Sequence, residues 1–257
     1  MISSLLFVYA CLCLYAYFGS DRSIFIPPPA NYRDSETIVK LPVRDGVEIS
    51  AIYLPNPEAD YTILYSHGNA EDLGLILPVL SQLHSFGFAV FAYDYQGYGT
   101  SDGKPSEYNA YLDINAAYRY LTQMLEIPPS QILLYGRSLG GGPSIDLASR
   151  EAVAGLIVEG TFVTTFRVVT RVSIVPFDKF DNLAKISNVY SPFLAIHGKR
   201  DEVVPFWHGE KLFEAANEPK QQFWVEEAGH NDLQMVAGDR YEQALREFIK
   251  LVEKNQK

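Results

Sequence analysis

The sequence predicts an α/β fold, with a mostly parallel central sheet and helices on both faces. Two strand-like segments within residues 37–54 precede segments that alternate between strand and helix patterns, and such alternation specifies a parallel sheet. Most of the later predicted strands are continuous apolar runs, as strands covered on both faces are. The chain has 257 residues, 47% of them hydrophobic, which is enough for one domain with a large core.

The elements follow in order from apolar periodicity and from the residues that interrupt it. Strands are predicted at 37–43, 47–54, 61–66, 88–93, 131–135, 153–158, 192–196 and 222–225. Helices are predicted at 73–86, 108–125, from about 140 to 150, 205–216 and 240–253. Gly87 ends the first of these helices, and Ser106 is a suitable cap for the second.

Composition excludes several classes of function. The formal net charge of −10 argues against nucleic-acid binding, which needs a basic face. The two cysteines, Cys11 and Cys13, lie near the N-terminus, so the body lacks a thiolate metal site and a cysteine nucleophile. They could carry acyl chains or be small apolar residues in a helix. Gly140-Gly141-Gly142 is not followed by the Lys-Ser/Thr pair of a phosphate-binding loop. We expect no metal and no cofactor.

Residues 1–20 contain no charged side chain, and 2–18 are nearly all apolar. Seventeen helical residues span about 26 Å, close to the roughly 30 Å of a bilayer core. We therefore expect a single membrane anchor, so that the membrane is a partner of the chain. A cleaved signal peptide, which would make the protein secreted, and a helix packed against the body are the alternatives.

The remaining chain divides into a linker at 21–36, which contains Pro27-Pro28-Pro29, and the α/β domain at 37–257. Arg22 and Arg33 follow the apolar segment and favour the cytoplasmic side for the body. The localisation expected from this pattern is therefore membrane-associated, with the body in the cytoplasm.

The pentapeptide Gly136-Arg137-Ser138-Leu139-Gly140 follows a predicted strand and precedes a predicted helix. This order is typical of a nucleophile elbow, in which a serine stands exposed on a sharp turn. Glycine two residues before and after the serine avoids collision with the neighbouring backbone. A flexible glycine-rich turn is the other interpretation of the same pattern.

An acid and a base are expected after the elbow, in the chain order Ser, Asp, His. Asp201 follows a predicted core strand, and His230 lies between the last predicted strand and the last helix. We expect His230 to accept the Ser138 proton and Asp201 to orient the imidazole. Alternatively, Asp201 caps a helix and Glu202 or Asp178 supplies the acid, or His230 is a turn residue.

An oxyanion hole needs two backbone N–H donors. We expect these to be Leu139, the residue after the nucleophile, and Asn69, in the loop after the third strand, with Ala70 as a substitute for Asn69. Asp94 precedes the elbow, which is the wrong order for the catalytic acid, and we expect it to hold its own loop by hydrogen bonds.

Together these motifs resemble the α/β-hydrolase family. More narrowly, the chain is similar to the branch of the eukaryotic membrane-bound protein depalmitoylases and their bacterial relatives, from about Phe25 to the C-terminus. The resemblance is carried by His67-Gly68-Asn69-Ala70-Glu71-Asp72-Leu73-Gly74, Tyr93-Asp94-Tyr95-Gln96-Gly97-Tyr98-Gly99, the elbow, the Asp201 loop and Gly229-His230-Asn231-Asp232. The N-terminal cysteine cluster of the depalmitoylases is replaced here by an apolar stretch with two cysteines.

We expect a serine hydrolase that cleaves carboxylic esters or thioesters through an acyl-Ser138 intermediate. Acyl lipids or acylated protein are the expected substrates. A serine peptidase on the same triad is the first alternative, and a non-catalytic scaffold is the second. The apolar segment 161–186 is either a lid over the site or an ordinary packing helix.

Overall fold

The central sheet of this computed structural model, which describes residues 2–256, has eight strands. Their spatial order is β1-β2-β4-β3-β5-β6-β7-β8. In chain order the strands are β1 (Ile38–Arg44), β2 (Val47–Leu54), β3 (Thr62–Ser66), β4 (Ala89–Tyr93), β5 (Ile132–Arg137), β6 (Gly155–Glu159), β7 (Phe193–Gly198) and β8 (Lys220–Val225). The pairs β1·β2 and β2·β4 are antiparallel, and all other pairs are parallel. The predicted fold class is confirmed.

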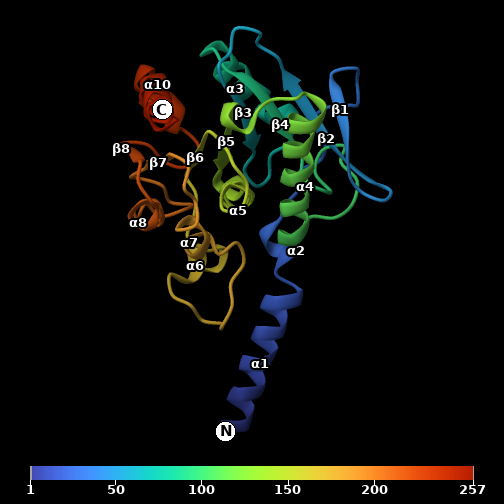
Figure 1. Cartoon of the computed structure of the whole chain (residues 1–257). Helices are drawn as coiled ribbons and strands as arrows, with labels where there is room; N and C mark the ends of the chain where they lie inside the picture. Colours follow the sequence, from blue (N-terminus) through green and yellow to red (C-terminus); the bar gives the residue numbers. More distant parts are fainter. Residues whose placement is uncertain (1, 257) are drawn as a thin grey trace.

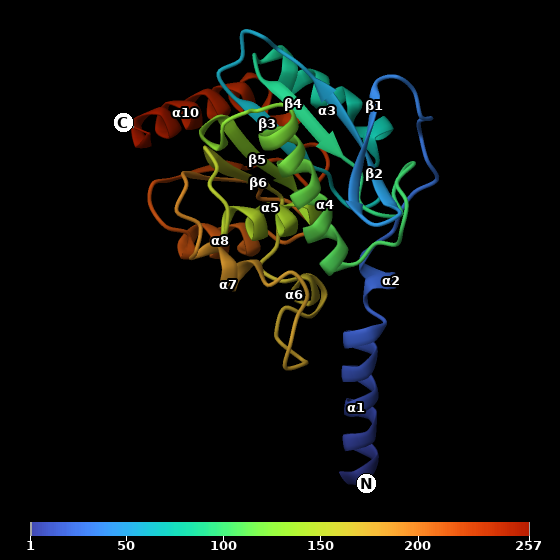
Figure 2. The same cartoon turned by 45° about the vertical axis from the view of Figure 1, so that its right-hand side comes forward.

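Ten α-helices accompany the sheet in the described part of the chain (Figures 1 and 2). They are α1 (Ile2–Phe18), α2 (Asp21–Ile24), α3 (Leu73–Ser85), α4 (Glu107–Arg119), α5 (Gly141–Ala148), α6 (Thr165–Thr170), α7 (Asn182–Ile186), α8 (Trp207–Ala215), α9 (Leu233–Ala237) and α10 (Asp239–Asn255). The predicted second helix continues past α4 as a π-helical turn, Tyr120–Met124. Its predicted cap is present, since the Ser106 side chain accepts a hydrogen bond from Asn109 N.

Two hydrophobic clusters lie on the two faces of the sheet. Successive side chains of a strand point to opposite faces, and β3 illustrates this alternation. Ile63 and Tyr65 pack in the cluster completed by α3 and α10, whereas Leu64 packs in the cluster completed by α4, α5, α7 and α8. Covering both faces explains why β3 to β7 are buried along nearly their whole length, and it leaves the carboxyl ends of the parallel strands for the site.

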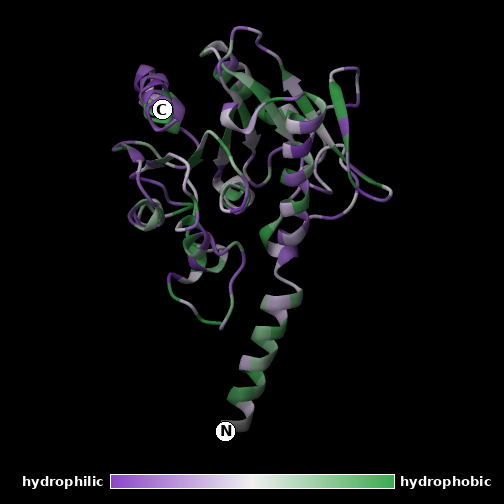
Figure 3. Cartoon of the chain, in the orientation of Figure 1, coloured by the Kyte–Doolittle hydropathy of each residue, from purple (hydrophilic) through white to green (hydrophobic). Residues whose placement is uncertain are grey.

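The N-terminal apolar segment forms α1, which projects away from the sheet and is hydrophobic along most of its length (Figures 1 and 3). The predicted membrane anchor is wrong, because no helix within residues 2–256 is both long enough and apolar enough to cross a bilayer. With 17 residues, α1 is about 26 Å long, shorter than a hydrocarbon core of roughly 30 Å. The membrane localisation expected from this segment is therefore wrong as well.

Segment 161–186 leaves β6 and runs through α6 and α7. Its ends belong to the core, because Phe162, Phe180 and Ile186 are buried. Its middle is open, with Val169 85% and Val172 63% exposed. The ends therefore pack as ordinary core, while the exposed middle borders the cavity described below.

Candidate active site

Ser138 stands at a strained turn directly after β5. Its φ of 50° is in the left-handed region, which is unusual for a residue other than glycine. A Cβ at Gly136 would lie 2.5 Å from Gly140 O, and one at Gly140 would collide with Ser66 O. The Thr161 hydroxyl donates to Ser138 O across 2.8 Å and holds the turn from the β6 side. The backbone here has the form of a nucleophile elbow.

Ser138, His230 and Asp201 lie in one hydrogen-bonded chain. His230 Nε2 is 3.0 Å from Ser138 Oγ, and His230 Nδ1 is 2.7 Å from Asp201 Oδ2. Asp201 follows β7 and His230 follows β8, so all three side chains meet at the carboxyl edge of the sheet. This arrangement allows the imidazole to accept the serine proton while the carboxylate stabilises the charged ring.

Asp201 is buried and held as a carboxylate. Burial opposes its ionisation, but hydrogen bonds from His197, His230 and Val204 N outweigh burial and lower the pKa of Asp201 well below its usual range. Its Oδ1 atom accepts from Val203 N at 2.9 Å and from Val204 N at 2.7 Å. The carboxylate therefore keeps its charge and its orientation toward His230.

The alternative acids lie elsewhere in the site region. Glu202 is exposed to solvent. Asp178 accepts hydrogen bonds from Thr164 Oγ1 at 2.6 Å and from Phe166 N at 2.9 Å, which fixes the start of α6. Of the acids that the sequence offered, Asp201 is the one bonded to His230.

Asp94 is fully buried and joins three segments of the chain. It accepts from Leu73 N at 3.0 Å, lies 3.2 Å from His67 Nε2 and accepts from Tyr32 OH at 2.5 Å. It thus links the loop before α3 to the N-terminal segment. The sequence predicted that Asp94 would hold its own loop, whereas these side-chain partners all lie in other segments.

Asn69 and Leu139 both line the cavity onto which Ser138 opens. The Asn69 side chain is anchored, because its Oδ1 accepts from Tyr98 OH at 2.6 Å and from Ile26 N at 2.9 Å. Its Nδ2 donates to Ile24 O. These contacts hold the loop beside the nucleophile, and the use of the two backbone N–H groups as oxyanion donors stays a prediction.

Arg137 connects the loops of the site, a role that the sequence did not reveal. It donates to Glu71 Oε1 at 2.6 Å, to Asn231 Oδ1 at 2.8 Å and to His230 O at 3.3 Å. Glu71 Oε2 in turn accepts from Gly68 N at 2.8 Å. One guanidinium therefore joins the elbow to the loop of the base and to the loop that carries Asn69. In the sequence, the one indication of this role is that Arg137 directly precedes Ser138 in the pentapeptide.

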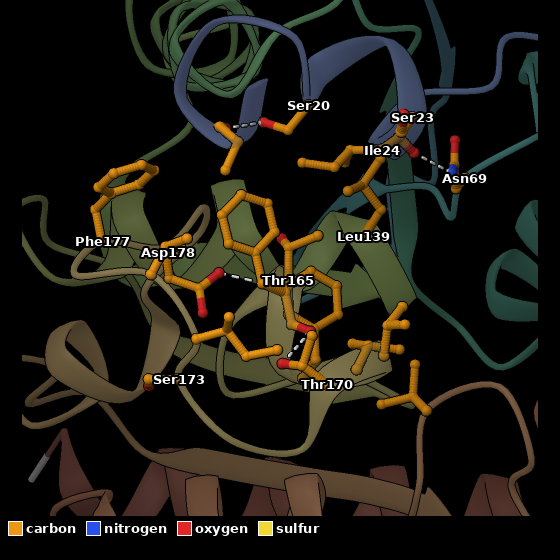
Figure 4. A pocket seen from close by; sticks show the side chains of 18 of the residues that line it. Ser20, Ser23, Ile24, Asn69, Leu139, Thr165, Thr170, Ser173, Phe177 and Asp178 are labelled. Carbon is orange, nitrogen blue, oxygen red and sulfur yellow. Dashed lines mark hydrogen bonds between the residues drawn. The ribbon is translucent and has the colours of Figure 1, made fainter. Parts of the chain in front are cut away.

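A cavity of about 430 Å³ begins at Ser138 and Leu139 and is lined mainly by apolar side chains. One side comes from segment 161–186, including Phe166, and the other from the N-terminal helices, including Ile24. Figure 4 shows Ile24, Leu139 and Phe177 among the side chains that surround it.

Two protein-family models match the chain. The model of the serine aminopeptidase S33 family matches residues 57–186, and that of the prolyl oligopeptidase family matches 171–251. Human alpha/beta hydrolase domain-containing protein 17B is 43% identical over 198 residues, covering 76% of this chain and 68% of that protein. Mouse protein 17C is 44% identical over 197 residues, covering 75% of this chain and 61% of that protein.

Solved structures share the fold at lower identity. The esterase Pf2001 of Pyrococcus furiosus has a TM-score of 0.72 at 20% identity, with 88% of this chain and 98% of that chain covered. Est1E of Butyrivibrio proteoclasticus, solved with ferulic acid, has a TM-score of 0.68 at 18% identity, with 82% and 99% covered. At these identities the likeness concerns the fold.

Proposed function

This chain belongs to the α/β-hydrolase family and is a serine hydrolase, and we propose that it cleaves carboxylic ester or thioester bonds through an acyl-Ser138 intermediate. The observation that carries the proposal is the hydrogen-bonded chain from Ser138 through His230 to Asp201, at the mouth of an apolar cavity.

In the first step Ser138 Oγ attacks the carbonyl carbon of the substrate, and its proton passes to His230 Nε2. The N–H groups of Asn69 and Leu139 stabilise the resulting oxyanion. The tetrahedral intermediate collapses, the bond to the leaving oxygen or sulfur breaks, and His230 protonates the departing alcohol or thiol. Water then attacks the acyl-serine by the same route, which releases the acid and restores Ser138.

The lining of the cavity supports an apolar acyl group as the part of the substrate held next to Ser138. Valine, leucine, isoleucine, phenylalanine and alanine together make up more than half of its lining residues, and burial of a hydrocarbon chain against them is favourable by about 0.8 kcal/mol per CH₂. Acyl lipids and acylated protein are therefore the proposed substrate classes.

The test compares wild type with Ser138→Ala. Wild type should react with a fluorophosphonate probe and hydrolyse acyl esters and thioesters, and the variant should do neither. Labelling that persists in Ser138→Ala would contradict the assignment of the nucleophile.

A serine peptidase activity is the second candidate, favoured by the aminopeptidase and prolyl oligopeptidase models that match this chain. The same triad can acylate on an amide, with His230 protonating the departing amine. Aminoacyl amides assayed beside the esters decide between the two candidates. Faster turnover of the amides, dependent on Ser138, would favour the peptidase.

A further inference from the structure

The cavity beside Ser138 has one wall that comes from the N-terminal segment. Six of its lining residues lie between positions 12 and 24, far in sequence from the catalytic residues: Leu12, Tyr15, Ala16, Ser20, Ser23 and Ile24. In α1, Leu12 and Ala16 are four residues apart and therefore lie on the same face of the helix. Leu14 does not line this cavity, and it points about 200° around the helix axis from Ala16.

The opposite wall is formed by segment 161–186, and α1 contacts this wall at several levels. Tyr9 OH donates to Ile174 O across 3.2 Å. The rings of Tyr17 and Phe177 meet edge to face, with centroids 5.5 Å apart. Because these contacts lie about two turns of α1 apart, the helix lies along the segment.

The end of α1 is also fixed to the catalytic body. Ala16 and Ser20 are buried. Just after α1, Asp21 pairs with Lys179 at 3.2 Å, and Ile24 O accepts from Asn69 Nδ2 beside the nucleophile. The inner face of α1 is therefore held in place relative to Ser138.

The occupant that fits this cavity is the acyl chain carried by Ser138 in the proposed intermediate. The cavity is continuous with Ser138, and side chains such as Phe166 and Val168 line it opposite Leu12 and Ala16. A hydrocarbon chain leaving the acyl-serine would run between these two walls. Each methylene that the walls cover should raise the specificity constant about fourfold.

We propose that α1 is a wall of the acyl-chain pocket, and that Leu12 and Ala16 determine how long a chain the enzyme accepts. This rests on the proposed acyl hydrolase function. It gives the apolar N-terminal helix a role in substrate selection, in which its inner face packs against the substrate.

The first test measures kcat/KM for p-nitrophenyl esters from acetate to palmitate. Leu12→Trp and Ala16→Trp narrow the cavity and should lower the ratio of long-chain to short-chain kcat/KM by at least about tenfold. Leu14→Trp, on the opposite face of α1, is the matched control and should keep the wild-type ratio. If Leu12→Trp and Ala16→Trp keep the wild-type dependence of kcat/KM on chain length, as Leu14→Trp should, the proposal is overturned.

A second test does not depend on turnover. Ser138→Ala protein is titrated with cis-parinaric acid, a fluorescent fatty acid, in the presence and absence of each tryptophan substitution. Leu12→Trp and Ala16→Trp should raise its Kd by at least about tenfold, and Leu14→Trp should not. An unchanged Kd in both inner-face variants refutes the pocket wall. Failure of wild type to hydrolyse any ester or thioester refutes the proposed function instead.

Folding is checked for every variant by its thermal unfolding. Leu12 is 43% exposed, so a larger side chain is tolerated there more easily than at the buried Ala16. If Ala16→Trp does not fold, Leu12→Trp alone decides both measurements.

Discussion

Arg137 Nη2 donates to Asn231 Oδ1 across 2.8 Å, which joins the residue before the nucleophile to the residue after the base. The same guanidinium binds His230 O and Glu71, so it ties the loop that carries the imidazole to the strand that ends beside Ser138. A hydroxyl and an imidazole exchange a proton only within a narrow range of distance. We therefore expect Arg137 to act as a positioning residue for the triad.

Replacing Arg137 with methionine should lower kcat about tenfold to a hundredfold and change KM little, because a displacement of about 1 Å at the reacting atoms has effects of that size. The measurements are steady-state kinetics and the rate of fluorophosphonate labelling. Arg150→Met is the control, since the exposed Arg150, just after α5, pairs locally with Asp146 and Glu151. Equal kcat values for Arg137→Met and wild type would remove the positioning role.

Asp201→Asn should reduce kcat by about 10³–10⁴ with KM nearly unchanged, because the amide no longer fixes the imidazole in its productive tautomer. The remaining side-chain oxygen can still accept from Val203 N and Val204 N, so the melting temperature should stay close to that of wild type. Kinetics and thermal unfolding of the same preparation measure both effects. A loss in kcat of less than tenfold would point to a different acid.

Gly140→Ala should destabilise the fold by about 2 kcal/mol or more and abolish hydrolysis. The added Cβ would collide with backbone atoms of Ser66 and His67, which cannot move aside as a flexible side chain can. Urea unfolding reports the loss. Gly229→Ala is the stability control, because a Cβ there meets its nearest atom at an ordinary 3.4 Å. Similar decreases in the free energy of unfolding for the two variants would show that the collision at Gly140 is not the cause of the destabilisation.

His208 should make the protein less stable in acid. Its Nδ1 atom accepts from Val163 N at 3.1 Å, which requires a neutral ring, and burial lowers the pKa of His208 to about 4, with help from the nearby His197 and Arg167. Between pH 6.5 and pH 4, His208 binds a proton in the unfolded chain but stays neutral in the folded chain. The free energy of unfolding therefore falls as the pH falls toward 4. The full effect is about 3 kcal/mol.

The test of His208 is the difference in urea-unfolding free energy between wild type and His208→Asn at several pH values. The asparagine oxygen can accept from Val163 N without titrating, so wild type should lose stability relative to the variant as pH falls from 6.5 to 4. Asp113 acts in the opposite direction, because burial raises its pKa to about 7, but this contribution is common to both proteins and cancels. A constant difference would contradict the prediction.

Local patterns were sufficient for most of the sheet. β4 is apolar throughout and β5 begins with four apolar or aromatic residues, and Gly87 and Pro128-Pro129 lie shortly before them, so their positions follow from the sequence within one or two residues. The short helices α6, α7 and α9 were not predicted separately, because helices of five or six residues contain too few turns to produce a clear 3.6-residue period. The N-terminal apolar run was recognised but assigned to a membrane.

By itself, the sequence determined the α/β fold class, the elbow around Ser138 and the choice of Asp201 and His230, because these depend on neighbours in the chain and on chain order. The tertiary structure decided that Arg137 joins three loops and that α1 borders the cavity of the nucleophile. In sequence, the residues that meet in this way are separated by at least 66 and by up to more than 120 positions. Which such side chains meet depends on how the whole chain packs, which no local pattern contains.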